Sequence, residues 1–212
     1  LSWNGDNEFV ENTNTTAKKK VHNLEHTIKI YGVDREGHSV SVNILKFKPY
    51  FYIKVDDDCS VKEKNTIMRS IQESMKEFIA NGILSAEFVH KKEFYGFTNK
   101  KDFKFIKFTF INLLSMKKCE MAIKDGIKVG KEIKYYKLYE SNILPFMRFM
   151  HEKGLEAAGW IKIPGFRYTL NSPKKSNCQI DIETEWEYVE FFQNKQMSPF
   201  LIASYDIECN SS

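Results

Sequence analysis

The chain has 212 residues, 42% of them hydrophobic and 14% aromatic, and its 32 basic and 28 acidic side chains leave a net charge of +4. This composition supplies a sizeable core for one large domain or two small ones and excludes wholesale disorder. The mild positive charge permits contact with a phosphate backbone, but it does not by itself indicate a nucleic-acid-binding protein.

The cysteines indicate an intracellular, reducing environment. They are too far apart for a Cys-x-x-Cys zinc motif and stand at Cys59, Cys119, Cys178 and Cys209. A lysine-rich chain without a signal peptide is expected to keep them as free thiols. No apolar run is long enough to cross a bilayer, so no membrane partner is expected.

The first 49 residues are predicted to hold a polar leader and a hairpin. Residues 1–20 are polar and end in three lysines, which we interpret as a solvated leader, with nucleic-acid contact as the alternative. From residue 21 the pattern changes, and hydrophobicity alternates over 26–33 and 39–47 on either side of a turn at 34–37. Two alternating stretches around a turn predict a β-hairpin.

Residues 50–140 show the pattern of a βαββαβ unit. Ser60 is a predicted helix N-cap, because Glu63 follows it three residues later as in a capping box. The predicted elements alternate as strand, helix, strand, strand, helix, strand, at 50–55, 61–81, 83–94, 103–111, 113–124 and 133–139. This is the split βαβ order that RNA-recognition modules also use.

The stretch 141–154 is predicted to form a wedged helix that ends at Gly154. Its middle, 144–150, is apolar on nearly every side, which is typical of a helix between two layers or domains. Arg148 is the only charge in that middle. Its guanidinium either pairs with a buried carboxylate across a domain interface or is carried to solvent by its stem.

A second, β-rich part is predicted from residues 21–49 and 155–192, with an OB-like arrangement as one candidate. The first two of its later strands are expected to form a hairpin, and these strands are 160–163, 166–170, 178–182 and 186–192. The whole chain is therefore predicted to be an α+β protein with mixed, mostly antiparallel sheets.

Aromatic residues interleaved with lysines are the candidate nucleic-acid contacts. In the strand 103–111, Ile106, Phe108 and Phe110 share one face and are expected in the core, whereas Phe103 and Phe105 lie on the other face. Rings on that face could stack on bases, or they could be ordinary core. An aromatic turn precedes the strand, and we interpret its rings as closing one end of the sheet, with single-strand contact as the alternative. The candidate DNA-binding residues are Tyr95, Phe97, Lys100, Lys101, Phe103 and Phe105.

Two carboxylates follow the last apolar run of the chain. Asp206 and Glu208 are separated by one residue, so a strand places them on the same side. Paired carboxylates at the end of a strand can hold divalent metal ions for phosphoryl chemistry.

The segment 204–209, Ser-Tyr-Asp-Ile-Glu-Cys, resembles the first exonuclease motif of the family B DNA polymerases. Further stretches resemble the delta-like replicative members from eukaryotes and large DNA viruses. These are the opening of the N-terminal domain at 30–37 and 49–52, its aromatic-glycine turn at 94–97, and the segment before the exonuclease domain at 144–161 with its following strand region at 178–186. In order along the chain, the resemblance covers residues 21–209.

The resemblance implies that Asp206 and Glu208 are catalytic metal ligands of a 3′→5′ proofreading exonuclease. Two Mg²⁺ ions would activate a water and stabilise the leaving 3′ oxygen in the full-length enzyme. It also implies domain limits: a leader at 1–20, the polymerase N-terminal domain at 21–195 and the start of the exonuclease domain at 196–212. The chain alone would then bind no metal and catalyse nothing.

The resemblance implies several partners. They are template–primer DNA, the single-stranded template, the enzyme's own exonuclease and polymerase domains, and a processivity factor, at a nuclear or a cytoplasmic viral replication site. Two alternatives need no polymerase: a stand-alone module that binds single-stranded nucleic acid, and a protein-interaction scaffold. Neither of these requires the carboxylate pair.

Overall fold

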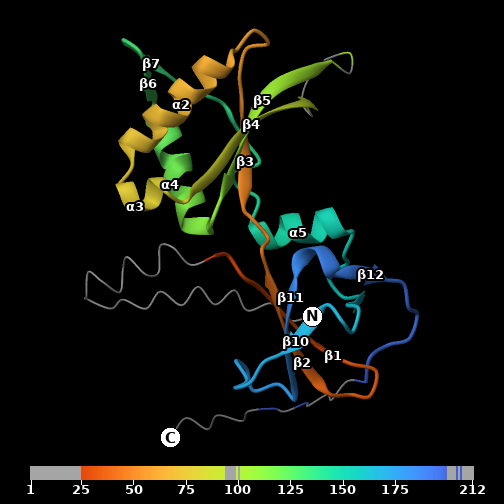
Figure 1. The fold of residues 1–212 in the computed structure, drawn as a ribbon. Helices are drawn as coiled ribbons and strands as arrows, with labels where there is room; N and C mark the ends of the chain where they lie inside the picture. Colours follow the sequence, from red (N-terminus) through yellow and green to blue (C-terminus); the bar gives the residue numbers. More distant parts are fainter. Residues whose placement is uncertain (1–24, 94–98, 100, 200–203, 205, 207–212) are drawn as a thin grey trace, which may run out of the picture.

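The computed structural model describes residues 25–93, 99, 101–199, 204 and 206. Figure 1 shows two parts joined by a helix: a sheet with helices on one side, and a smaller assembly of strands. Each part has its own cluster of buried apolar side chains. None of the helices in the described residues has the length and apolar character that a bilayer crossing requires.

The first part is the predicted βαββαβ unit. Its sheet has the order β4-β5-β3-β8, and every neighbouring pair is antiparallel. In chain order the elements are β3 (Tyr50–Lys54), α2 (Val61–Ser74), β4 (Ile83–Lys92), β5 (Asp102–Phe110), α4 (Leu113–Lys124) and β8 (Leu138–Tyr139). The order in space is the one expected for a split βαβ arrangement, so this prediction is confirmed.

Alternation along the strands separates the core from the opposite face. Phe51, Ile106 and Phe108 are fully buried under the helices, together with Ile67 of α2 and Met116 of α4. Burying such side chains contributes about 1.5–3 kcal/mol each, so this face supplies much of the stability of the unit. Ile106, Phe108 and Phe110 are core residues, as the sequence predicted.

The helices begin at residues whose side chains accept from the first turn. Ser60 Oγ accepts from the backbone N–H of Glu63 at 3.1 Å, and Asn112 Oδ1 accepts from that of Ser115 at 2.9 Å. The prediction of a single helix up to residue 81 is wrong. Helix α2 ends before Met75, whose backbone is extended, and a short α3 (Glu77–Ala80) follows.

The strand predicted at 133–139 is also divided. β6 (Ile127–Val129) and β7 (Glu132–Lys134) form a separate two-stranded ribbon, and only β8 joins the main sheet. Gly130 adopts a positive φ of 68° in the turn of this ribbon, a conformation that glycine reaches without strain. The local turn thus withdraws part of the apolar run from the sheet.

The second part is built on the predicted hairpin of β1 (Ile28–Val33) and β2 (Ser39–Leu45). The strand β11 (Ile180–Glu185) adds to β2 in parallel, and β10 (Tyr168–Leu170) completes the order β1-β2-β11-β10. In the described residues this sheet has four strands, whereas an OB fold is a five-stranded, partly open barrel.

The hairpin expected from 160–163 and 166–170 does not form. Instead β9 (Trp160–Lys162) pairs with β12 (Glu190–Phe192), which follows the 3₁₀ turn η1 (Trp186–Tyr188), while β10 pairs with β11. The Pro164-Gly165 turn therefore carries the chain from one sheet to another.

The helix α5 (Pro145–Lys153) lies between the two parts (Figure 1). Its N-cap is Leu144, so the helix begins later than the predicted stretch 141–154, and Pro145 occupies the first turn, where a missing N–H costs little. Gly154 ends the helix in the left-handed conformation, with φ of 61°. Phe149 is fully buried in the second core, edge-on to Phe47 with ring centroids 5.8 Å apart.

A buried carboxylate anchors the loop that leads into β11. Asp181 is only 1% exposed, and its side chain accepts from Asn43 Nδ2 at 3.2 Å, Asn171 Nδ2 at 2.6 Å and the backbone N–H of Lys175 at 2.8 Å. Burial opposes the charged form, yet the hydrogen bonds outweigh it, and the pKa of Asp181 lies below its usual value.

We expect Asp181→Ala to destabilise the chain by about 1–3 kcal/mol, because buried donors would lose their acceptor. A carboxyl with a depressed folded pKa stabilises the fold above its unfolded pKa of about 3.9 and loses this contribution as the pH falls through the folded pKa. The excess stability of the wild type over the variant should therefore shrink at acid pH. Urea unfolding at several pH values measures it, with the exposed Asp58→Ala as control. Equal stability of both variants would contradict this role.

Candidate nucleic-acid interface

The face of the main sheet opposite the helices is lined by aromatic rings. Because side chains alternate, the residues beside the core positions of β3, β5 and β8 all point to this face. The rings are Tyr50, Tyr52, Phe103, Phe105 and Tyr139, and we call them the aromatic layer.

Neighbouring rings of the aromatic layer meet edge to face. The centroids of Tyr50 and Tyr52 are 5.6 Å apart, those of Tyr52 and Phe105 are 6.4 Å apart, and those of Phe105 and Tyr139 are 5.1 Å apart. Such pairs add about 0.5–1.5 kcal/mol beyond the area they bury. The layer is therefore held together from ring to ring across three strands.

Cationic side chains lie over these rings. Lys107 Nζ is 4.1 Å from the Tyr50 centroid, Lys91 Nζ is 4.6 Å from that of Tyr52, and Lys54 Nζ is 3.8 Å from that of Phe103. Lys137 lies over Tyr139 in the same way, at 4.8 Å. Cation–π contacts of this kind contribute about 0.5–1 kcal/mol at exposed sites, which is enough to orient a flexible lysine. The rings thus present ammonium groups to solvent.

Two of these lysines are held by one carboxylate. Glu93, only 12% exposed and next to the end of β4, accepts from Lys54 Nζ at 2.8 Å and forms an ion pair with Lys137 Nζ at 3.4 Å. The hydroxyl of Tyr139 also donates to Glu93. The hydrogen bond from Lys54, followed by that from Tyr139, lowers the pKa of Glu93 to about 2. In contrast, Lys91 and Lys107 form no ion pair with a carboxylate in the described part of the chain.

Arg148 links helix α5 to the aromatic layer. Its guanidinium is buried, lies 3.9 Å from the Tyr50 centroid, and donates to Glu140 Oε2 at 2.5 Å. The Tyr50 hydroxyl in turn donates to Glu152 of α5. Of the two alternatives for Arg148, the structure shows the pairing, although its partner Glu140 is partly exposed and not buried.

The predicted DNA-binding residues differ in whether the structure describes them and in what they contact. Tyr95, Phe97 and Lys100 lie outside the described residues. Lys101 is exposed and pairs with Asp57 at 3.1 Å, and its Nζ is also 5.3 Å from the half-buried ring of Phe103.

The expectation that Phe105 stacks on a base needs correction. Its ring is on the predicted face but is only 3% exposed, packed between Tyr52 and Tyr139, and it leaves no ring surface open to a base. Sequence reasoning also missed the contributions of Tyr50, Tyr52 and Lys91. The signal was present, because Tyr-x-Tyr-x-Lys at 50–54 repeats the alternation of Phe-x-Phe-x-Lys at 103–107.

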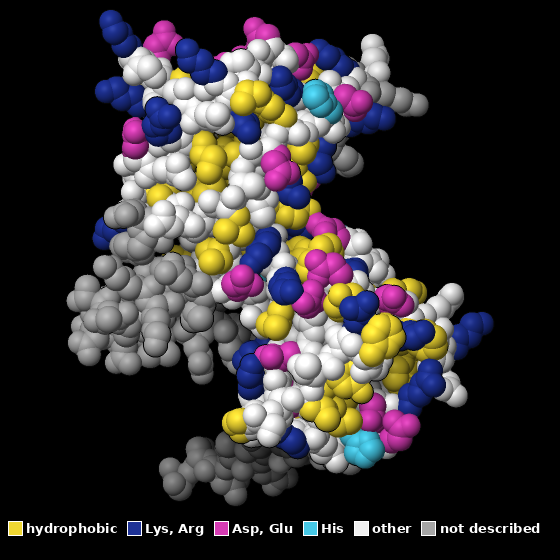
Figure 2. All heavy atoms as spheres, viewed as in Figure 1, with side chains coloured by type: hydrophobic (Ala, Val, Ile, Leu, Met, Phe, Trp, Pro, Cys, Tyr) yellow, Lys and Arg dark blue, Asp and Glu magenta, His cyan; other side chains and the backbone are white. Residues whose placement is uncertain are grey.

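The paired carboxylates can be placed only in part. Asp206 is exposed, and Glu208 lies outside the described residues. Figure 2 shows basic and acidic side chains interspersed over the surface of both parts, as the small net charge implies.

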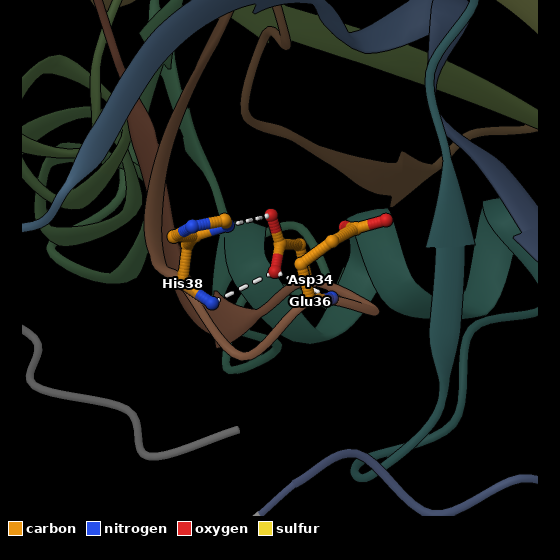
Figure 3. Close-up of side chains that lie close together, drawn as sticks. All are labelled: Asp34, Glu36 and His38. Carbon is orange, nitrogen blue, oxygen red and sulfur yellow. Dashed lines mark hydrogen bonds and ion pairs between the residues drawn. The ribbon is translucent and has the colours of Figure 1, made fainter.

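One group in the described residues has the side chains to hold a metal ion: Asp34, Glu36 and His38, in the turn between β1 and β2 (Figure 3). Asp34 Oδ1 accepts from the backbone N–H groups of Glu36 at 3.0 Å and His38 at 2.8 Å. Asp34 Oδ2 lies 2.9 Å from His38 Nδ1. These bonds stabilise the turn, which accounts for the cluster without an ion.

Two family models match the chain. One is described as the DNA polymerase delta catalytic subunit-like N-terminal domain and matches residues 46–117. The other is described as the DNA polymerase family B exonuclease domain and matches residues 136–212. The first covers most of the βαββαβ unit, and the second begins near β8.

Curated relatives match along most of the chain. A DNA polymerase of Pyramimonas orientalis virus is 36% identical over 89% of this chain and 16% of the relative. The DNA polymerase delta catalytic subunit of Dictyostelium discoideum is 30% identical over 86% of this chain and 18% of the relative. The chain thus spans less than a fifth of the length of these relatives.

A solved structure has the same fold. The family B DNA polymerase of the archaeon Pyrobaculum calidifontis matches 82% of this chain and 19% of its own, with a TM-score of 0.57 and 20% identity. The family models and the curated relatives define the class as family B DNA polymerases, and the first model matches this chain as their N-terminal domain. The chain belongs to the family B DNA polymerases, among the delta-like members that include those of large DNA viruses.

We expect the Glu93 carboxyl to titrate near pH 2 in the folded chain, because Lys54 and Tyr139 favour its charged form. Carboxyl-detected NMR measures this midpoint directly. Replacing the first of these partners, in Lys54→Ala, should raise the midpoint, whereas Lys118→Ala on α4 should leave it in place. A midpoint that does not respond to Lys54→Ala would contradict the ion pair.

Proposed function

We propose that this chain forms the non-catalytic N-terminal domain of a DNA-directed DNA polymerase used in replication, in which it flanks the single-stranded template. The family supports the enzyme class, because the curated relatives carry the names DNA polymerase and DNA polymerase delta catalytic subunit. The chain alone would be inactive, because the proposed activity belongs to a protein several times longer.

The observation that carries the template role is the pair of lysines on the aromatic layer that have no carboxylate partner within the described residues. Lys91 and Lys107 lie on Tyr52 and Tyr50, which hold their ammonium groups at the sheet surface. Phosphate oxygens are the natural partners of such groups in nucleic acids. Phosphate contacts carry no sequence information, and a template strand must be accepted whatever its sequence.

Binding through stacked bases is disfavoured by the same geometry. RNA-recognition modules use exposed rings on this face of the sheet. Here lysines cover Tyr50, Tyr52 and Phe103, and Phe105 is buried. A base would have to displace an ammonium group before it reached a ring. The proposed contact is therefore with the phosphate backbone of the nucleic acid and does not read its bases.

For the full-length enzyme we propose that Asp206 and Glu208 bind the divalent ions, Mg²⁺ by the family resemblance, of a 3′→5′ exonuclease. Such ions activate a water and stabilise the leaving oxygen. Carboxylate oxygens suit Mg²⁺, and the exposure of Asp206 is compatible with a ligand role. The other proposed partners are the enzyme's exonuclease and polymerase domains and a processivity factor, at a nuclear or cytoplasmic viral replication site.

We expect this chain to bind single-stranded DNA in a salt-dependent way and Lys91→Ala with Lys107→Ala to weaken that binding. The slope of log affinity against log salt should fall by about 0.7 for each lysine removed. Fluorescence anisotropy with oligothymidylate and a mixed-sequence strand measures both quantities. The matched control is Lys62→Ala with Lys118→Ala, which removes two exposed lysines from the helices on the opposite side of the sheet. Equal losses in both double variants would exclude the proposed face.

We expect Asp206→Ala with Glu208→Ala to abolish proofreading in the full-length polymerase, because metal ligands would be lost. The excision of a mismatched 3′ end, followed over a range of Mg²⁺ concentrations, measures this activity. Primer extension on a matched end is the control and should persist. Retained excision with an unchanged Mg²⁺ dependence would remove these carboxylates from the site.

A further inference from the structure

The cations of the aromatic layer fall into two sets that differ in one respect. Lys91 and Lys107 lie on rings and, in the part of the chain that the structure describes, pair with no carboxylate. Lys54 and Lys137 are held by rings and, in addition, by Glu93. The same face thus offers two ammonium groups to a phosphate and neutralises two others.

Glu93 is well placed to keep its lysines. Its Oε2 accepts a hydrogen bond from Lys54 Nζ, and its Oε1 accepts hydrogen bonds from Lys137 Nζ and the Tyr139 hydroxyl. Both carboxylate oxygens are therefore hydrogen-bonded. The carboxylate is largely buried against the end of the sheet, whereas the Lys54 and Lys137 side chains are 31% and 68% exposed. Both ammonium groups are therefore reachable from solvent while they remain paired.

We propose that Glu93 sets the affinity and salt dependence of this face for single-stranded nucleic acid by competing with its phosphates for Lys54 and Lys137. This inference rests on the proposed template role of the aromatic layer. A carboxylate and a phosphodiester offer the same kind of acceptor to an ammonium group, and the carboxylate is already in place. Glu93 thereby limits the number of phosphates that the face neutralises.

Limiting the number of phosphate contacts matters for a template that must move across the face. Each phosphate contact adds to affinity and to the salt slope, so four engaged lysines would grip a strand more firmly than two. A weaker and less salt-sensitive contact guides a strand without holding it in one register. Glu93 therefore determines how tightly the nucleic acid is bound, although it does not itself contact the nucleic acid.

The test is Glu93→Gln, which removes the charge and keeps an acceptor for Tyr139 and Lys54. We expect the 212-residue chain carrying it to bind oligothymidylate about threefold more tightly, in line with the energy of an exposed ion pair. The salt slope should steepen by about 0.7 for each lysine released. The control is Glu73→Gln, an exposed carboxylate on α2, on the opposite side of the sheet, which removes the same charge and pairs with no lysine among the described residues.

A second arm of the experiment removes the lysines, with Glu93 present and with Glu93 replaced. In the wild type, Lys54→Ala should change binding little, whereas Lys107→Ala should weaken it. In the Glu93→Gln background, Lys54→Ala should cancel part of the gain. Thermal unfolding of each variant confirms that the differences arise in the folded state.

The outcomes separate the two proposals. If Glu93→Gln and Glu73→Gln strengthen binding equally, net charge explains the effect and the role of Glu93 is overturned. The same follows if Lys54→Ala weakens wild-type binding as much as Lys107→Ala does. If neither the wild type nor any variant binds the strand, the template role itself fails.

Discussion

The antiparallel pairing of β3 with β5 is the interaction on which the rest depends. Its register sets Phe51 opposite Phe108 on the helix side and Tyr52 opposite Lys107 on the other. A shift by one residue would exchange the two faces, burying lysines and exposing the core. The burial of apolar side chains on one side therefore fixes which rings and cations lie on the other, so the core determines the geometry of the proposed binding face.

Helix α5 extends this constraint to the second part of the chain. Phe149 packs edge-on against Phe47 in the second core, and Arg148, one residue earlier, lies over Tyr50 of the first sheet. Adjacent residues of one helix thus contact both parts. Arg148 also pairs with Glu140, which directly follows β8, so this ion pair and the contact with Tyr50 join α5 to the first part. The aromatic layer is in this way held beside the β-rich part.

The accuracy of the sequence predictions follows the range of the interactions. The β1–β2 hairpin and the cap at Ser60 are local and were predicted. The pairing of β11 with β2 joins segments far apart in the chain, and no periodicity specifies it, so a hairpin of neighbouring strands was expected at 160–170 instead. At the site, alternation identified the face that Phe103 and Phe105 share with Lys107. It did not show that Lys54 of β3 lies over Phe103 or that Lys91 of β4 lies over Tyr52, because contacts between strands depend on tertiary packing.

Burial explains why aromatic content alone was a misleading guide to base stacking. A ring such as Phe105 stabilises the sheet by losing contact with solvent, and stacking on a base requires the opposite. In the aromatic layer, the ammonium groups of Lys91 and Lys107 lie over the rings of Tyr52 and Tyr50. The rings are thereby covered, and the charges are on the outer side. In the role that we propose, such a face would contact the repeating charge of a nucleic acid strand and not the identity of its bases, as a surface that guides a template must.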